Sequence, residues 1–220
     1  TKSANMKPVY LILFFSFCTI KTNAQWTEFC SGATNGFVVD FASYNDSLFS
    51  TGFFTTVCGE SADHIAKWDG SNWIPTKNSF SQNGHAIDSL NGKLYASLYQ
   101  FTTDSNYIYA YDGAGWQQVG DGVYQNNPGV GFSKNATIYD MISYNDRIIA
   151  CGDFDTYKDI AVNGIMQWDG TEWSPLGSGL TEFIPGAPQI LYPHNMTVFE
   201  GKLIVVGNFY KAGGNIVNGI

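Results

Sequence analysis

Short apolar segments alternate with turn dipeptides along most of this chain. Four turn pairs each separate two runs rich in apolar and β-branched residues: Asn45-Asp46, Asn91-Gly92, Asn145-Asp146 and Glu200-Gly201. The Asn-Gly pair is typical of a type I′ hairpin, because both central residues need positive φ. The runs that follow the turns are Ser47–Phe54, Lys93–Tyr99, Arg147–Phe154 and Lys202–Phe209. No window combines a 3.6-residue apolar period with helix caps, so the pattern predicts strands and essentially no helix in the mature chain.

Two motifs mark these runs as copies of one repeat. Three runs end on Gly-x-Phe, at Gly52, Gly152 and Gly207, whereas the second copy has Leu98-Tyr99-Gln100 in register. An aromatic-Asp-Gly-x-x-Trp motif follows, sixteen residues after the glycine in copies one and three and thirteen after Leu98 in copy two. Its residues are Trp68, Asp69, Gly70 and Trp73; Tyr111, Asp112, Gly113 and Trp116; Trp168, Asp169, Gly170 and Trp173. Self-similarity at this spacing indicates a repeat architecture.

Each copy contains four strand-like pieces. In the second copy these are Ala86–Leu90, Lys93–Tyr99, Tyr107–Tyr111 and Trp116–Val119. Four antiparallel strands per roughly 45–55 residues are typical of a β-propeller blade. We therefore predict an all-β fold, a β-propeller of four-stranded antiparallel blades truncated within its fourth blade. The blades cover residues 33–79, 80–122 and 123–179, and the incomplete blade covers 180–220.

The two ends of the repeat array suggest a longer ring. Trp26 is followed by Cys30-Ser31-Gly32 in the register in which Trp116 is followed by Gly120-Asp121-Gly122. Residues 25–32 are therefore predicted to form an orphan outer strand that completes the last blade. By the sixteen-residue spacing, the aromatic of the fourth copy falls just after Ile220. We expect a fragment of a longer ring that an extension would stabilise; the alternative is a complete, irregular four-bladed propeller.

The first 24 residues have the features of a secretory signal peptide. Met6-Lys7 begins a basic region, Val9–Ile20 is apolar, and Thr22-Asn23-Ala24 supplies small residues for cleavage before Gln25. Residues 1–5 are expected to lie upstream of the true start. The apolar run is too short to span a bilayer. We expect a secreted or cell-surface protein with no membrane span in the mature chain.

Charge and cysteine content agree with an exported protein. The formal charge is −8, and removal of the leader takes away three lysines and no acidic residue, which leaves −11. Such an acidic chain offers no electrostatic footprint for nucleic acid. In an oxidising compartment Cys30 and Cys58 are candidates for a disulfide, although both could instead be buried thiols. Cys151 directly precedes Gly152 of the Gly-x-Phe signature, on an inner strand, and is predicted to be a core thiol.

Candidate catalytic chemistry is sparse. His64, His85 and His194 lack metal-type partners at helical or hairpin spacing, so we expect surface or loop histidines. No Gly-x-Ser-x-Gly nucleophile motif occurs. Asp153 and Asp155 alternate on one strand and suggest either a cation site or a solvated strand end, of which the second is favoured. The sequence thus predicts no catalytic residue, no cofactor and no metal.

The repeated motif residues have two interpretations. Trp73, Trp116 and Trp173 could be sugar-stacking platforms, but their shared repeat position favours packing between neighbouring blades. The carboxylates of the motif are predicted to accept backbone N–H groups within their own turns; these are Asp69, Asp112 and Asp169.

The combined pattern resembles the kelch-like propeller repeats of exported bacterial proteins. It consists of a strand ending in Gly-x-Phe, followed by Trp-Asp-Gly-x-x-Trp and then Leu-Gly-x-Gly. It is also similar to the repeats of fungal cortical cell-polarity marker proteins. The resemblance covers nearly all of Gln25–Ile220. It implies a propeller, and among secreted bacterial relatives such repeats often precede a sorting domain of the type IX secretion pathway. A cell-surface or released protein is therefore implied, and no catalytic residue is carried over.

Two classes of function remain open from the sequence. The first is a non-catalytic binding, adhesion or scaffold module whose unknown protein or glycan partner binds to loops at one rim. The candidate loops are Gly120–Ala136 and Gly177–Asn195, which carry Tyr124, Phe132, Phe183 and Tyr192. The alternative is the propeller part of a carbohydrate- or alcohol-active extracellular enzyme, galactose-oxidase-like or a glycosidase. The first is favoured because the alternative needs a metal or acid–base constellation that the sequence does not display.

Overall fold

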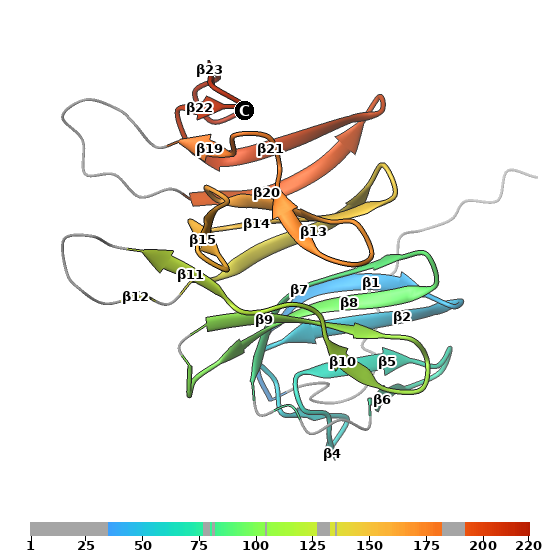
Figure 1. The fold of residues 1–220 in the computed structure, drawn as a ribbon. Helices are drawn as coiled ribbons and strands as arrows, with labels where there is room; N and C mark the ends of the chain where they lie inside the picture. Colours follow the sequence, from blue (N-terminus) through green and yellow to red (C-terminus); the bar gives the residue numbers. More distant parts are fainter. Residues whose placement is uncertain are drawn as a thin grey trace, which may run out of the picture.

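A computed structural model describes residues 35–76, 80, 82–103, 105–126, 133–134, 136–181 and 192–220. Every regular element in these ranges is a β-strand, and the strands pair antiparallel in several sheets (Figure 1). The predicted all-β fold is therefore confirmed. The described ranges contain no helix of the length and apolarity needed to cross a membrane. The predicted leader, 1–24, and the predicted orphan strand, 25–32, lie outside the described residues.

Each of the first three repeats forms a four-stranded meander, and the fourth forms a hairpin. We number these sheets 1 to 4. Sheet 1 has the order β1 (Val38–Tyr44), β2 (Ser47–Gly52), β5 (Ile65–Trp68), β6 (Trp73–Pro75). Sheet 2 follows as β7 (Asn83–Leu90), β8 (Lys93–Gln100), β9 (Ser105–Tyr111), β10 (Trp116–Gln118). Sheet 3 contains β13 (Ile138–Tyr144), β14 (Arg147–Gly152), β17 (Ile165–Trp168), β18 (Trp173–Pro175), and sheet 4 pairs β20 (Tyr192–Phe199) with β21 (Lys202–Asn208).

The four predicted hairpin turns are confirmed. Both central residues of each turn have positive φ, at Asn45 and Asp46, Asn91 and Gly92, Asn145 and Asp146, and Glu200 and Gly201. This backbone conformation matches the twist of the flanking strands in two-residue hairpins. The turns therefore fix the same register of first and second strand in every repeat.

The sequence did not predict a short hairpin that lies between the second and third strands of three repeats. Its strands are β3 (Thr56–Val57) with β4 (Glu60–Ser61), β15 (Thr156–Tyr157) with β16 (Ile160–Ala161), and β22 (Lys211–Ala212) with β23 (Asn215–Ile216). Strands of two residues are too short to show an alternation of apolar and polar positions. The first and third copies therefore contain more than the four predicted strands.

The segments that connect the repeats also pair. Strand β11 (Val123–Asn126) pairs with β15 of the third repeat and, through Val123 and Asn106, with β9 of the second; β12 (Ser133–Lys134) pairs with β11. Likewise β19 (Leu180–Thr181) pairs with β22. A blade was expected to form its own sheet, and this is wrong for the second and third copies, which β11 joins into one sheet. The backbone N–H and C=O groups of β11 form hydrogen bonds with the β15–β16 hairpin of the third repeat.

The Gly-x-Phe signature has a steric cause. A Cβ on Gly52 would lie 2.1 Å from the carbonyl oxygen of Phe37, and one on Gly152 would lie 1.9 Å from that of Thr137. In the second copy the cross-strand pair is Gly84 with Leu98, so the glycine sits on the partner strand. There a Cβ would meet Thr51 Oγ1 of sheet 1 at 1.8 Å. In copy two the residue in close contact with a neighbouring segment is thus Gly84 of the first strand, and the second strand carries Leu98 in place of the signature glycine.

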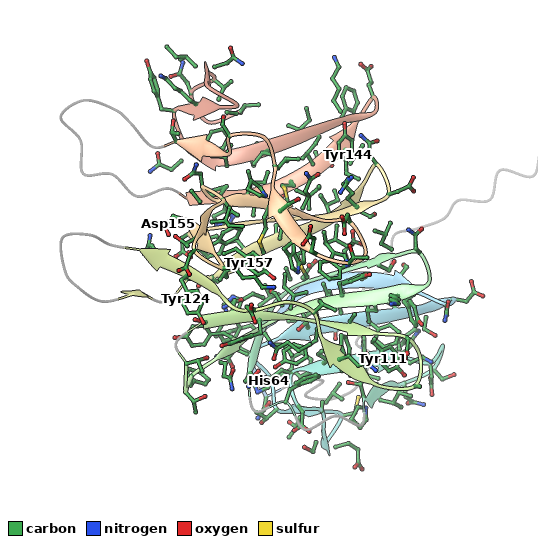
Figure 2. All side chains as sticks on the ribbon, viewed as in Figure 1. His64, Tyr111, Tyr124, Tyr144, Asp155 and Tyr157 are labelled. Carbon is green, nitrogen blue, oxygen red and sulfur yellow. The ribbon has the colours of Figure 1, made fainter. Side chains whose placement is uncertain are left out.

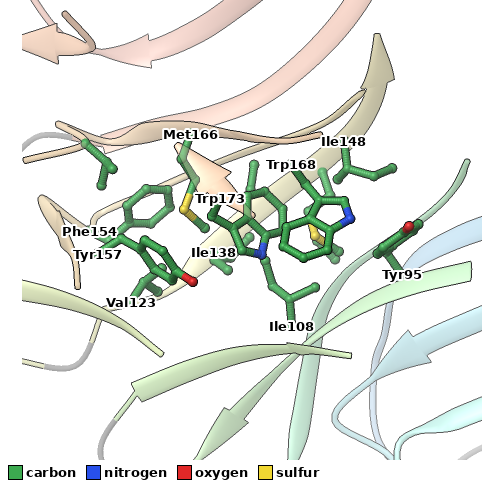
Figure 3. Packing of buried hydrophobic residues seen from close by; sticks show 14 of the residues in the cluster. Tyr95, Ile108, Val123, Ile138, Ile148, Phe154, Tyr157, Met166, Trp168 and Trp173 are labelled. Atoms are coloured by element: carbon green, nitrogen blue, oxygen red, sulfur yellow. The ribbon is translucent and has the colours of Figure 1, made fainter. Parts of the chain in front are cut away.

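Apolar residues fill the surfaces between consecutive sheets. Between sheets 2 and 3, Trp168 and Trp173 pack with Tyr95 and Ile108 (Figure 3). Trp173 is 3% exposed, and its Nε1 donates to the Val119 carbonyl oxygen at 3.3 Å. The equivalent Trp73 and Trp116 are partly buried, with ring centroids 5.6 Å from Trp68 and 5.2 Å from Tyr111.

The aspartates of the repeat motif cap their own turns, as predicted. Asp69 Oδ1 accepts from the N–H groups of Ser71 and Asn72, both at 2.8 Å. Asp112 Oδ1 accepts from Ala114 and Gly115, and Asp169 Oδ1 from Thr171 and Glu172. The hydrogen bonds from the Glu172 N–H and from Thr171 lower the pKa of Asp169 to about 2.

Candidate functional site

Every first strand carries one bulged residue near the end opposite its hairpin turn. The pairing register shifts between Val38 and Asp40, Gly84 and Ala86, Ile138 and Asp140, and Pro193 and Asn195. The extra residues, one per repeat, are Val39, His85, Tyr139 and His194. A bulge leaves its residue outside the regular ladder and re-aims the side chain, and bulges often lie next to functional sites.

Around the second bulge, aromatic rings from two sheets meet. The ring of His85 lies 5.0 Å from that of Phe53, the second residue of the sheet 1 Gly-x-Phe, and 6.4 Å from Tyr99. Phe37 extends the row from Phe53, at 6.2 Å, and Phe101 extends it from Tyr99, at 5.1 Å. We call these five residues the aromatic rim. Phe37 is 73% exposed, Phe101 63% and Phe53 37%, so the rim presents three exposed phenylalanine rings around the partly buried His85 and Tyr99.

The next two bulges make a related but more polar arrangement. The ring of Tyr139 stacks on His194, with centroids 6.0 Å apart and planes 9° apart. The Tyr139 hydroxyl donates to Asp153 Oδ2 at 2.8 Å, and the Thr137 N–H donates to Asp153 Oδ1 at 2.5 Å. Asp155 Oδ1 accepts from Thr156 Oγ1 at 2.6 Å. Asp153 therefore positions Tyr139, and the favoured interpretation of this aspartate as a solvated strand end is wrong.

Surface or loop positions were expected for the three histidines, and only His85, a partly buried residue of β7, departs from this. His64 lies in a turn with positive φ, but it is only 6% exposed. His85 is half-buried among the rings, and burial lowers its pKa to about 4. His194 is exposed. Within the described ranges, no three His, Cys, Asp or Glu side chains are grouped so that they could hold a metal ion.

The depressed pKa of His85 predicts a loss of stability in mild acid. In unfolded chains histidine titrates near its ordinary pKa of about 6.5, so between pH 7 and pH 5 the unfolded state takes up a proton that the folded state does not. We expect this residue to reduce the free energy of unfolding by about 1–2 kcal/mol over that interval. Chemical denaturation at both pH values should show that His85→Gln lacks this part of the pH dependence.

The exposed His194 provides the control for this measurement. His194→Gln should show the same change of stability between pH 7 and pH 5 as the unmodified chain. If His85→Gln also followed the pH dependence of the unmodified chain, the ring environment of His85 would contribute nothing to it.

A belt of half-buried aspartates links the first strands of successive repeats. Asp40 Oδ2 accepts from the Ile87 N–H at 2.8 Å, Asp88 Oδ2 accepts from the Ser143 N–H, and Asp140 Oδ2 accepts from the Met196 N–H at 2.5 Å. Burial raises the pKa of all three carboxyl groups. That of Asp140 rises to about 7, with a further contribution from the charges of Asp40 and Asp88. These carboxylates hold neighbouring sheets together rather than facing a ligand.

The sequence predicted four binding residues on the long inter-repeat loops, and of these only Tyr124 has a described side chain. Phe132 and Phe183 lie outside the described residues, and Tyr192 begins β20 without a described side chain. Tyr124 lies on β11, and a hydrogen bond with Tyr107 raises its pKa. Figure 2 places Tyr124 and Asp155 at the end of the molecule opposite Tyr111 and Tyr144. Tyr124 therefore lies at the end that carries the bulges, outside the aromatic rim.

Two further features were considered as sites. A depression of about 310 Å³ between sheets 1 and 2 is lined by Phe49, Lys67, Ile74 and Tyr111. The charged side chain in its lining, Lys67, lies over the Phe49 ring at 5.8 Å, which is a packing contact. Cys58 is disulfide-bonded, whereas Cys151 is a free, fully buried thiol, as predicted. Cys30 lies outside the described residues, so the Cys30–Cys58 pairing stays a prediction.

The aromatic rim could not be found by comparison with characterised proteins. No protein-family model matches the chain, and no curated protein matches it. The site is therefore defined by geometry alone.

Proposed function

We propose that this chain is a non-catalytic, extracellular binding module built from β-propeller blades, and that it binds a protein partner over the aromatic rim. The observation that carries the proposal is the row of contacting rings from Phe37 to Phe101, of which Phe37, Phe53 and Phe101 are exposed. Contiguous exposed apolar patches on folded proteins mark interaction sites, and aromatic residues are enriched at the centres of protein interfaces.

The arrangement of the sheets supports a propeller. Sheets 1 to 4 stack in chain order, and their first strands lie side by side (Figure 1). The aspartate belt joins each first strand to the next by a hydrogen bond. In a propeller, the first strands of the blades surround the central axis, and loops at one end form the binding face. The aromatic rim lies at one end of these first strands.

Two observations support a location outside the cytoplasm. The apolar run Val9–Ile20 with its small-residue cleavage site has the form of an export signal. The disulfide at Cys58 fits an oxidising compartment, since such bonds are rare in reducing ones. A secreted or cell-surface location is therefore part of the proposal, and type IX secretion is one route compatible with the sequence resemblance.

The bonding of two carboxylates next to the Tyr139 bulge favours binding over catalysis. Asp153 accepts hydrogen bonds from the Thr137 N–H and the Tyr139 hydroxyl, and Asp140 accepts from the Met196 N–H. Hydrolysis of a glycosidic bond needs a pair of carboxyl groups that face the substrate. These two instead have structural partners. The carbohydrate- or alcohol-active enzyme therefore remains the second candidate.

Rim variants provide the direct test. Peptides selected against the purified chain from a random displayed library should bind Phe53→Ala and Phe101→Ala at least about tenfold more weakly, as expected for the loss of interface anchors. The melting temperature should change little, because both side chains are partly or largely exposed. Biolayer interferometry with the selected peptides measures the affinities.

Ile160 supplies a matched control, because it is 50% exposed on the β15–β16 hairpin and is not one of the five rim residues. Ile160→Ala should bind like the unmodified chain. The same assay with Tyr124→Ala tests the neighbouring candidate. Selected peptides that bind all rim variants equally would refute the rim as the site, and turnover of a saccharide or alcohol by the purified chain would establish the enzyme alternative.

A further inference from the structure

Asn-Gly pairs are the positions at which an asparagine side chain cyclises most readily onto the main chain, because glycine has no Cβ to hinder its nitrogen. The chain contains five such pairs, all within the described ranges. Only in Asn91-Gly92, the turn between β7 and β8, are both residues exposed. The other pairs each contain a residue that is partly or fully buried, and they begin at Asn35, Asn83, Asn163 and Asn218. The β7–β8 turn therefore leaves room for ring closure and for the attack of water.

Hydrogen bonds of the side-chain amide also distinguish these asparagines. The amide of Asn35 bonds to Thr55 through both its oxygen and its nitrogen, at 2.8 Å each. Nδ2 of Asn163 donates to the Ser178 carbonyl oxygen at 3.0 Å. Within the part of the chain that the structure describes, no group bonds to the Asn91 side chain or to the N–H of the glycine that follows it. The two groups that must meet in the ring are thus both free in this turn.

The same turn carries a contact between sheets 1 and 2. The Tyr44 hydroxyl donates to the Gly92 carbonyl oxygen at 3.2 Å, and Tyr44 is only 6% exposed. The contact recurs between sheets 3 and 4, where the Tyr144 hydroxyl donates to the Gly201 carbonyl oxygen at 3.1 Å. There the residue before the glycine is Glu200, which has no side-chain amide to lose. The repeat therefore makes this contact twice and places a labile residue in one of the two.

We propose that Asn91 is a site of spontaneous deamidation, and that the isoaspartate formed there breaks the contact between Tyr44 and the turn. The Gly92 nitrogen forms a bond to Cγ of Asn91 and gives up its proton, the bond from Cγ to Nδ2 breaks, and ammonia leaves. Water then opens the resulting cyclic imide. Attack at Cγ restores the normal main chain as an aspartate, whereas attack at the main-chain carbonyl carbon leaves an isoaspartate, in which the main chain continues through Cγ.

Isoaspartate lengthens the main chain by one carbon and leaves a carboxylate on Cα. A two-residue hairpin turn fixes the register of its strands, here Leu90 opposite Lys93, so it cannot absorb the added atom without moving. The Gly92 carbonyl oxygen then leaves the Tyr44 hydroxyl, and a largely buried donor loses its acceptor, which destabilises the fold. This change is independent of the aromatic rim, which contains neither residue.

Ageing of the full chain at pH 8, followed by peptide mapping with mass spectrometry, tests the site. Asn45 and Asn145 are matched controls, because they stand at the same turn position with φ values of 46° and 50°, against 50° for Asn91, but precede Asp. Deamidation at Asn91 should be at least about tenfold faster than at Asn45, Asn145 or Asn163, which corresponds to a barrier about 1.4 kcal/mol lower. Equal rates at Asn91 and Asn163, or an Asn91 that stays intact while another asparagine reacts, would overturn the assignment.

The consequence for the inter-sheet contact is measured separately. The isoaspartyl fraction, isolated by ion exchange and identified by the same mapping, should melt at a lower temperature than the fresh chain. Asn91→Asp carries the added charge without the added main-chain carbon and should melt close to the fresh chain. In Tyr44→Phe, which lacks the hydroxyl, residue 91 should age at the same rate with a smaller fall in melting temperature. An isoaspartyl chain as stable as the fresh one, or a Tyr44→Phe chain that loses as much on ageing as the unmodified chain, would show that the Tyr44 contact is not what the modification breaks.

Discussion

Replacing Trp173 by Ala is expected to lower the free energy of unfolding by about 3–5 kcal/mol, the usual cost of deleting a large buried aromatic side chain. The ring is 3% exposed and fills the core between sheets 2 and 3 (Figure 3). Its Nε1 bonds to the Val119 carbonyl oxygen, which joins the two sheets at their outer strands. A Cβ on Gly120 would lie 2.9 Å from the ring, so the chain of sheet 2 passes directly over it. Urea denaturation followed by circular dichroism measures the loss.

The equivalent tryptophan of sheet 1 provides a graded comparison. Trp73 occupies the same repeat position but is only partly buried, so Trp73→Ala should cost clearly less than Trp173→Ala. Equal losses would show that repeat position alone, rather than burial, sets the contribution. A Trp173→Ala chain of normal stability that no longer bound saccharides would instead make this tryptophan a sugar-stacking platform.

Features that depend on neighbours in sequence were predicted correctly. The turn pair Asn91-Gly92 adopts positive φ at both residues because few other dipeptides tolerate that conformation. Asp69 bonds to N–H groups two and three residues ahead of it, which is a local property of the Asp-Gly turn. The predicted strand order of the first three repeats follows from such local signals, since short connections make consecutive strands pair.

The aromatic rim depends on distant pairing and was not predicted. Phe53 and His85 lie on different sheets, and His85 reaches Phe53 only because a bulge at Gly84–Ala86 re-aims it. The bulged positions hold Val39, His85, Tyr139 and His194, three different residue types, so the repeat pattern does not mark them as one set. The predicted binding residues were instead taken from long loops, of which Tyr124 alone has a described side chain. Surfaces formed where several copies meet are therefore less visible in sequence than the copies themselves.

Neutralising Asp140 is expected to stabilise the protein above neutral pH. The pKa of this carboxyl group rises from 3.8 to about 7 on folding, because of burial and of the charges of Asp40 and Asp88. The folded state thus retains a proton that the unfolded state releases between about pH 4 and pH 7, and stability falls as the pH rises through that range. Asn keeps one oxygen for the Met196 N–H but gives up the second acceptor, which offsets about 1 kcal/mol. We expect Asp140→Asn to raise the free energy of unfolding by about 1–3 kcal/mol at pH 8 and to change it little at pH 4.

The repeat itself supplies a precedent and an opposite control for this change. Asn195 stands at the position of Asp140 in sheet 4, so an amide is compatible with the bulge. In Asp169 the hydrogen bonds from the Glu172 N–H and Thr171 lower the pKa to about 2, so its charged form is the one that folding favours. Asp169→Asn should therefore reduce stability at pH 8, and the reduction should shrink as the pH falls toward 2. Urea unfolding curves of both variants at pH 4 and pH 8 separate the two carboxylates. A loss of stability in Asp140→Asn at pH 8 would contradict this expectation. It would mean that the hydrogen bonds accepted by the two carboxylate oxygens stabilise the fold by more than the burial of the charge and its repulsion from Asp40 and Asp88 destabilise it.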